Sequence, residues 1–151
     1  MWQKLASDLD ALLDSTDHPI TTLANSAAFL YQNIERINWL GFYLYDGSKL
    51  YLGPFAGKPA CTTIEMGKGV CGTSAQKREV IVVEDVDKFP GHIACDPDSR
   101  SEIVLPLVLQ DGTLFGVFDI DSAELARFGT EERDGLLMIS QLIARKIVQK
   151  G

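Results

Sequence analysis

The stretch INWLGFYLYDGSKLYL at residues 37–52 indicates the kind of fold. Residues 37–45 alternate in the manner of a strand, in which successive side chains face opposite sides of a sheet. Asp46-Gly47 is a strong turn signal, and residues 49–52 supply a second strand after it. The stretch therefore predicts a β-hairpin.

Further elements are predicted on both sides of this hairpin. Two helices precede it, the first over residues 2–13 and the second opening at Pro19. After it we expect strands at 61–66, 80–83, 103–109 and 114–120, a short helix after Cys71, and a closing helix with Thr130 as its N-cap. The chain is thus predicted as an α/β (α+β) protein with a largely antiparallel sheet of about six strands, the N- and C-terminal helices on one face and the loops on the other.

Length and charge restrict the classes of function. A chain of 151 residues suits one domain, 1–151, that can bury a core without disulfides or metals. A net charge of −7 argues against nucleic acid as a partner, and no apolar run approaches the roughly 20 residues that span a membrane. Acidic residues near the N-terminus do not suit a signal peptide, so we expect a cytoplasmic protein.

Three cysteines make thiol redox chemistry the first hypothesis. Cys71 follows Gly67-Lys68-Gly69 at the predicted start of a helix, where free N–H groups favour a thiolate. Cys95 lies in a loop rich in proline and aspartate. Cys61 falls in a predicted strand, where packing as a small hydrophobe is an equal alternative. A structural zinc site with His18 or His92 as fourth ligand is disfavoured, because the spacing of zinc ligands is missing.

Strand alternation also predicts a pocket. Trp39 and Tyr43 share one strand face, and in the later hairpin Asp119 and Asp121 share a face with Phe115 and Val117. Glu102 falls at the same end of that hairpin. Such a pocket suits a small zwitterion with an apolar tail, such as a free amino acid, whose carboxylate the N–H groups of residues 69–73 could receive. The alternatives are a second hydrophobic layer for the aromatic residues and a surface strand end for Asp121.

Five motifs give the chain a family resemblance over nearly its whole length. They are WLGFY at 39–43, GKGVCG at 67–72, HIACD at 92–96, SEIVLP at 101–106 and GVFDIDS at 116–122. With these motifs the chain resembles the free methionine-(R)-sulfoxide reductases, which are single GAF domains. The three cysteines also fall where the redox cysteines of that family fall.

This resemblance implies a six-stranded antiparallel sheet, reduction of free methionine sulfoxide, recycling by thioredoxin, and neither a metal nor another cofactor. It makes Cys95 the attacking cysteine, Cys71 its resolving partner and Cys61 a further cysteine that can join disulfide exchange. It also implies two groups of substrate-binding residues: Trp39 and Tyr43 for the methyl sulfinyl group, and Glu102, Asp119 and Asp121 for binding and protonation.

Two other functions remain open at this point. One is a GAF-type sensor module that binds a small molecule or a cyclic nucleotide, and the other is a thiol protein that buffers redox state without a substrate. The amphipathic terminal helices also offer a surface through which two copies could form a homodimer.

Overall fold

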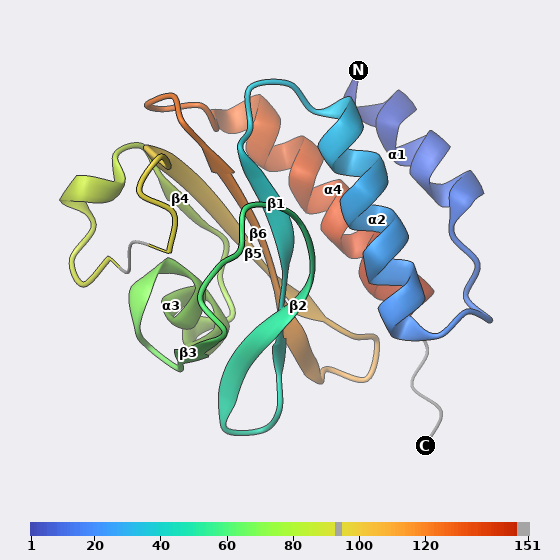
Figure 1. Cartoon of the computed structure of the whole chain (residues 1–151). Coiled ribbons are helices and arrows are strands. Elements are labelled where there is room, and N and C mark those ends of the chain that lie inside the picture. The colour runs from blue at the N-terminus through green and yellow to red at the C-terminus, as the bar shows by residue number, and fades with distance from the viewer. Residues whose placement is uncertain (93–94, 148–151) are drawn as a thin grey trace.

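The computed structural model describes residues 1–92 and 95–147. This part of the chain forms four α-helices and one six-stranded sheet, and Figure 1 shows how they are arranged. The helices are α1 (Trp2–Leu12), α2 (Pro19–Asn33), α3 (Gly69–Lys77) and α4 (Thr130–Lys146), with a short 3-10 helix, η1, at Val86–Lys88. The strands are β1 (Trp39–Tyr45), β2 (Lys49–Gly57), β3 (Thr63–Glu65), β4 (Ile81–Val83), β5 (Ser101–Val108) and β6 (Leu114–Ser122).

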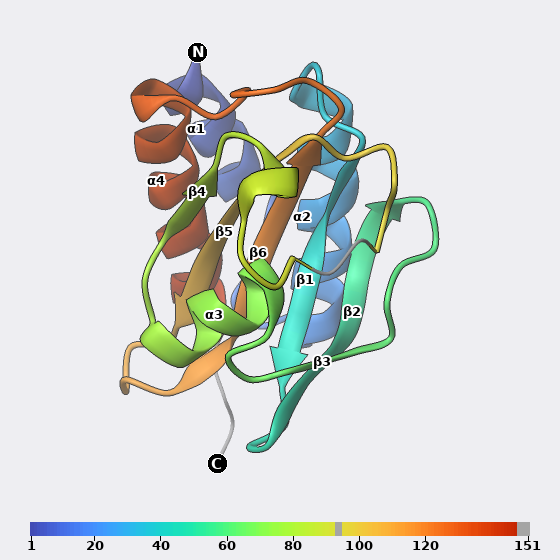
Figure 2. The ribbon, with the colours of Figure 1, turned by 90° about the vertical axis from the view of Figure 1, so that its left-hand side faces the viewer.

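The sheet is antiparallel, with the strand order β3-β2-β1-β6-β5-β4. The two predicted hairpins are β1–β2 and β5–β6, and they join where β1 pairs with β6 at the centre. Helices α1, α2 and α4 cover one face of the sheet, whereas α3 and the long loops cover the other (Figures 1 and 2). The predicted fold class and the division of the two faces are therefore confirmed.

Each face of the sheet carries its own hydrophobic cluster. Leu40 and Phe42 of β1 point toward the three large helices, and Trp39 and Tyr43 point toward α3, as the alternation predicts. All four side chains are buried. Burial of such a side chain contributes about 1.5–3 kcal/mol of stability. The helix-side cluster contains more buried hydrophobic residues than the α3-side cluster, so it contributes more to stability, and the α3 side can carry polar groups.

Two strands differ from the prediction. The strand expected at 61–66 contains only Thr63–Glu65, so Cys61 lies in a loop instead. In β6, Phe115 packs on the helix side, although alternation places it with Val117. The pairing changes from Leu107–Gly116 to Val108–Leu114 and skips Phe115, so an irregularity of the bulge type turns this side chain to the other face.

The closing helix begins with Thr130 in its first turn, so Gly129 and not Thr130 is the N-cap. The carboxylate of Glu132, the third residue of the helix, accepts a hydrogen bond of 2.9 Å from the Gly129 N–H. This side chain therefore gives the N-cap N–H group a hydrogen-bond partner. Arg145 and Lys146 in the last turn complement the helix dipole.

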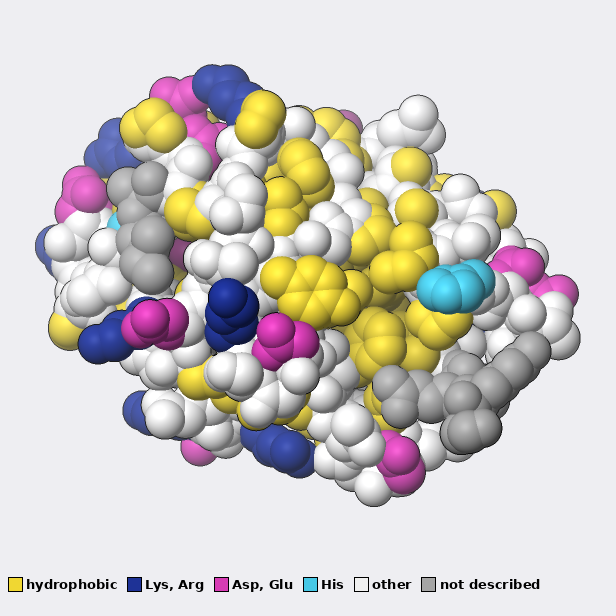
Figure 3. Space-filling view, turned by 60° about the horizontal axis from the view of Figure 1, so that its bottom comes forward, with side chains coloured by type: hydrophobic (Ala, Val, Ile, Leu, Met, Phe, Trp, Pro, Cys, Tyr) yellow, Lys and Arg dark blue, Asp and Glu magenta, His cyan; other side chains and the backbone are white. Residues whose placement is uncertain are grey.

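The apolar faces of the terminal helices are buried inside this chain. Leu5 and Leu9 of α1 and Ile139 and Ile143 of α4 belong to the helix-side cluster. At the end of the sheet that carries both hairpin turns, Figure 3 shows a gathering of hydrophobic side chains on the surface. A hollow in this region is lined by residues that include Tyr45, Tyr51 and Phe115. In the described ranges, none of the helices has the length and apolar character to cross a bilayer.

Candidate functional site

A cavity lies between the sheet and α3, at the end of the sheet away from the hairpin turns. Strands β1, β5 and β6 form its floor, α3 forms one wall, and His92 and Cys95 also line it. It brings together seven of the eight predicted site residues: Trp39, Tyr43, Cys71, Cys95, Glu102, Asp119 and Asp121. The eighth, Cys61, is bonded to Cys95.

Three carboxyl groups, those of Glu102, Asp119 and Asp121, form an acid cluster in this cavity. The strand register explains their proximity, because Glu102 pairs with Asp121 across β5 and β6, and Asp119 follows two residues away on the same face. Their exposed fractions are 6%, 5% and 8%. Strand alternation predicted only that the three acids lie at the same end of a hairpin. The structure adds that they are buried together.

Burial changes the ionisation of the acid cluster. Removal from water raises the pKa of Asp119 to about 8, and the neighbouring Asp121 carboxylate adds to this effect. The pKa values of Glu102 and Asp121 are raised well above the ordinary range, first by burial and then by the charge of a neighbouring carboxylate. The cluster therefore holds protons that exposed carboxyl groups would have lost at neutral pH.

An aromatic wall lies beside the acids on the same face of the sheet, because Trp39 of β1 pairs directly with Asp121 of β6. The Trp39 and Tyr43 rings stack with centroids 6.0 Å apart, and Phe55 of β2 stacks on Trp39 at 5.4 Å. Gly41 lies between the two aromatic residues in β1, and a Cβ atom there would come within 2.7 Å of the Trp39 ring. The wall therefore requires glycine at this position.

The polar atoms of the wall hold the loop at residues 58–62, called here the Cys61 loop. The Trp39 indole N–H donates to the Lys58 carbonyl at 3.0 Å, and the Tyr43 hydroxyl donates to the Cys61 carbonyl at 2.9 Å. Two side chains that face the cavity thus also position the loop that carries one of the cysteines.

Residues 95–100, called here the Cys95 loop, are tied to the same elements. The Asn38 amide, just before β1, donates to the Asp96 carboxylate at 3.0 Å and to the Ser99 hydroxyl at 3.2 Å. Lys58 forms an ion pair with Asp98, which links the two loops directly. These contacts bring the two cysteine-bearing loops together.

The disulfide joins Cys61 to Cys95, with Cα atoms 5.3 Å apart. The expected partner of Cys95 was Cys71, which is a free thiol in this structure. The two loops held together by Asn38, Trp39, Tyr43 and Lys58 account for this pairing. The sequence left open whether Cys61 or Cys71 forms the disulfide with Cys95, and only the family resemblance favoured Cys71.

Cys71 lies in the first turn of α3, as predicted, but the expected thiolate does not follow. The side chain is 4% exposed, and burial raises the pKa of its thiol well above the ordinary value, with Asp119 and Glu102 adding to the effect. Desolvation and neighbouring acids thus outweigh the helix terminus. Cys71 is a protonated thiol inside the cavity.

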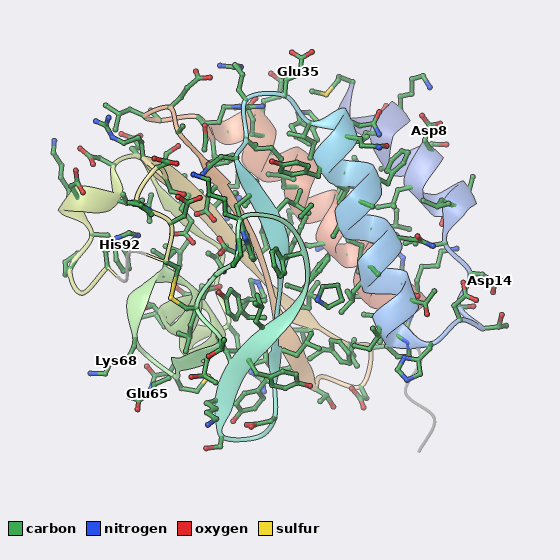
Figure 4. All side chains as sticks on the ribbon, in the orientation of Figure 1. Asp8, Asp14, Glu35, Glu65, Lys68 and His92 are labelled. Carbon is green, nitrogen blue, oxygen red and sulfur yellow. A yellow bond between two sulfur atoms is a disulfide. The ribbon has the colours of Figure 1, made fainter. Side chains whose placement is uncertain are left out.

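Two histidines were considered as zinc ligands. His18 lies outside the cavity, where its Nδ1 accepts a hydrogen bond from the Ile20 N–H at the start of α2. His92 lines the cavity, with its Nε2 atom 3.9 Å from Oε1 of Glu102, and Figure 4 shows it on the side of the sheet away from α1 and α2. Burial lowers the pKa of His92.

Three further side chains line the cavity, and the sequence analysis assigned no role to them. Lys68 lines the cavity just before α3, and Asp96 and Ser99 of the Cys95 loop do so as well. Gly69 and Val70 also line it, so the start of α3, whose N–H groups are predicted to receive a carboxylate, lies at the cavity. The glycines on both sides of Lys68 predict a turn just before α3, and this turn could have indicated that Lys68 lies at the cavity.

The cavity has a volume of about 40 Å³ with the disulfide in place. A buried water needs about 10–15 Å³ on this measure, so the space holds roughly three water molecules. A free amino acid needs more room than this.

Comparison with known proteins adds independent findings. The family model described as "GAF domain" matches residues 8–147. A free methionine-R-sulfoxide reductase of Escherichia coli is 48% identical over 141 residues, which cover 93% of this chain and 83% of that protein.

Two similar solved structures carry related names. The reduced form of fRMsr of Staphylococcus aureus is 42% identical, with a TM-score of 0.93, and the match covers 97% of this chain and 95% of that one. The free methionine-R-sulfoxide reductase of Neisseria meningitidis in complex with its substrate is 38% identical, with a TM-score of 0.89, and covers 97% and 87%.

Proposed function

The chain belongs to the free methionine-R-sulfoxide reductases of the GAF domain family and is an oxidoreductase, and from this premise we propose that it reduces free L-methionine (R)-sulfoxide with Cys95 as the attacking thiol. The observation that carries the proposal is the cavity that contains Cys95, the acid cluster and the aromatic wall together. Loss of the Cys61–Cys95 bond and movement of the Cys95 loop would open this cavity for the substrate.

Each part of the substrate has a chemical counterpart in the cavity. The aromatic wall of Trp39 and Tyr43 can hold the methyl sulfinyl group, since sulfur and methyl groups pack well on aromatic rings. The acid cluster can bind the ammonium group, and the N–H groups at Gly69 and Val70 can receive the carboxylate. A peptide-bound methionine sulfoxide lacks both free termini, which accounts for a preference for the free amino acid.

The chemical step needs a nucleophile and an acid. The Cys95 thiolate attacks the sulfoxide sulfur, and a carboxyl group of the acid cluster protonates the sulfoxide oxygen. Methionine then leaves, and the oxygen remains on Cys95 as a sulfenic acid, so the substrate is reduced by two electrons and the thiol is oxidised by two. The raised pKa values of Glu102, Asp119 and Asp121 support this role, because each can hold a proton near neutral pH.

The sulfenic acid is then resolved by a second cysteine. We assign this step to Cys61 in place of Cys71, because the Cys61 loop already holds its thiol against Cys95. Condensation of the Cys61 thiol with the sulfenic acid forms the disulfide and releases water. Thioredoxin, in the cytoplasm, then reduces the disulfide by thiol exchange.

A stoichiometric assay tests the proposal. Reduced protein is mixed with free R or S methionine sulfoxide without a reductant, and released methionine is counted per protein chain. We expect one methionine from the R form, none from Cys95→Ser, and one from Cys61→Ser with steady turnover by thioredoxin strongly slowed. Methionine release by Cys95→Ser would overturn the role of Cys95.

The sensor alternative is less compatible with the cavity. A cyclic nucleotide would bring its anionic phosphate against three buried carboxyl groups, which repel it when ionised and leave its charge without a cationic partner when protonated. A thermal-shift comparison of methionine sulfoxide with cyclic nucleotides separates the two functions, and a redox buffer would release no methionine in the assay above.

A homodimer stays a prediction. The terminal helices that suggested it bury their apolar faces in their own chain, whereas the hydrophobic surface at the hairpin turns in Figure 3 is free for contact. Sedimentation at several protein concentrations tests it.

A further inference from the structure

The cavity also contains a set of side chains that suits a metal ion. One ligand atom each from Cys71, Glu102 and Asp119 lies within 4.8 Å of the others, and all three side chains are buried. Ligand atoms around a tetrahedral zinc ion lie roughly 3.5 Å apart, given metal–ligand distances of about 2.0–2.3 Å. A contraction of about 1 Å would therefore close the three atoms around an ion.

A second observation points to a ligand in the same place. Asp119 is 95% buried and lines the cavity, and its Oδ1 atom receives no hydrogen bond from an amide or hydroxyl group of the described residues, since its polar neighbours are the Glu102 carboxyl and the Cys71 thiol. Such a buried oxygen normally has a partner, and an orphan one indicates a group that the protein receives from outside. The cavity of about 40 Å³ has room for an ion with a water.

We propose that Cys71, Glu102 and Asp119 bind a zinc ion in this cavity, and that His92, which lies outside this group of three, turns toward the ion as a fourth ligand. The imidazole lines the same cavity, with Nε2 at 3.9 Å from the Glu102 carboxylate. A thiolate, an imidazole and two carboxylates favour zinc over calcium or magnesium, which take oxygen ligands only. A divalent cation would also offset the repulsion within the acid cluster.

The consequence for the enzyme is reversible inhibition by zinc, and this consequence rests on the proposed function. Zinc would occupy Glu102 and Asp119, which the proposed mechanism needs for the substrate ammonium and for the proton. The ion is therefore not a cofactor of the reaction but a competitor of the substrate.

Binding is tested without substrate, so that it stands apart from the reductase activity. Protein oxidised to the Cys61–Cys95 disulfide has Cys71 as its one remaining thiol, because the sequence contains three cysteines. Added Co²⁺ should give a thiolate-to-cobalt charge-transfer band and the strong visible bands of a tetrahedral site, at one ion per chain. Zn²⁺ should displace the cobalt.

Matched variants decide the outcome. Zinc affinity, measured against a chromophoric chelator, should fall by about 10- to 100-fold or more in Cys71→Ser and in the nearly isosteric Asp119→Asn, and several-fold in His92→Asn. Asp8→Asn, which removes an exposed carboxylate from α1, should bind zinc like the parent. Circular dichroism checks that each variant is folded. If Cys71→Ser does not fold, the zinc affinity of Asp119→Asn tests the site in its place. A cobalt spectrum without the charge-transfer band, or unchanged zinc affinity in a folded cavity variant, would overturn the site.

Discussion

Asp119 shows what burial does to a single side chain in this protein. Its carboxyl group lies on β6 between the aromatic wall and α3, and its pKa is raised from 3.8 to about 8. The unfolded chain loses this proton near pH 4, whereas the folded protein keeps it up to about pH 8. The contribution of Asp119 to stability is thus present at low pH and is lost as the pH rises across that window.

We predict that Asp119→Asn reduces this pH dependence. The melting temperature of the parent should fall between pH 5 and pH 8, and the variant should show a shallower fall and a higher melting temperature at pH 8. Glu102 and Asp121 titrate in the same direction, so part of the slope remains. Thermal melts in a buffer series measure this, with Asp8→Asn as the exposed control. Parallel curves for parent and Asp119→Asn would contradict the prediction.

The Tyr43 hydroxyl connects the cavity wall to the Cys61 loop. We predict that Tyr43→Phe, which removes the hydrogen bond to the Cys61 carbonyl, costs about 1 kcal/mol of stability and slows closure of the Cys61–Cys95 disulfide. Urea unfolding gives the stability, and timed alkylation of free thiols gives the closure rate. Tyr45→Phe, on the same strand, is the matched control, and equal closure rates in the two variants would count against the loop-positioning role.

At the scale of elements, the packing of α1 against α4 depends on a glycine, Gly135 of α4. The Trp2 side chain lies directly on Gly135, where a Cβ atom would be 2.4 Å from the indole ring. Both residues are buried, and α1 packs mainly against α4, which in turn packs on β5 of the sheet. Glycine in a helix interior costs about 1 kcal/mol relative to alanine, and here close helix packing offsets that cost.

Gly135→Ala should therefore destabilise the protein by about 1–3 kcal/mol, because overpacking outweighs the gain in helix propensity. In a Trp2→Ala background the same substitution should instead stabilise by roughly 1 kcal/mol. A double-mutant cycle from urea unfolding measures both values. Additive effects in the cycle would show that Trp2 and Gly135 are not coupled.

The elements that could be predicted from sequence are those whose pattern is local. The β1–β2 hairpin follows from alternation and the Asp46-Gly47 turn, and the common end of Glu102 and Asp121 follows from the β5–β6 hairpin. Phe115 could not be placed, because the irregular pairing of Val108 with Leu114 depends on how the strands align and not on a residue pattern.

The cysteine chemistry was predictable only in part. Cavity placement of Cys95 and Cys71 followed from their loop and helix positions, but the protonation of Cys71 depends on burial beside acids from other strands. The pairing of Cys61 with Cys95 depends on side-chain contacts between loops, such as the ion pair of Lys58 and Asp98. Neither the protonation of Cys71 nor the pairing of Cys61 with Cys95 can be predicted from the spacing of the cysteines.

At the scale of the molecule, the Cys61–Cys95 bond closes a segment that contains β3, α3 and β4. The cross-linked residues are 34 apart in sequence. For a loop of this length, the chain-entropy estimate is roughly 3–4 kcal/mol of stabilisation relative to the reduced chain. Formation or reduction of this disulfide is therefore expected to change the stability of the fold.

Reduction with dithiothreitol should lower the free energy of unfolding by up to about 3–4 kcal/mol. Urea unfolding with and without reductant measures the difference. The Cys61→Ser/Cys95→Ser double variant, which cannot form the bond, should be indifferent to reductant, and an equal response of both proteins would assign the effect to something else.

The outer strands of the sheet have a consequence for aggregation. A long open edge presents backbone groups to which another polypeptide can add, the route by which many sheets polymerise. Here both borders end in strands of three residues, β3 and β4, and the stretch of β2 that extends past β3 contains Pro54, which has no N–H to donate. The native sheet therefore offers another polypeptide little exposed edge on which a fibril could start.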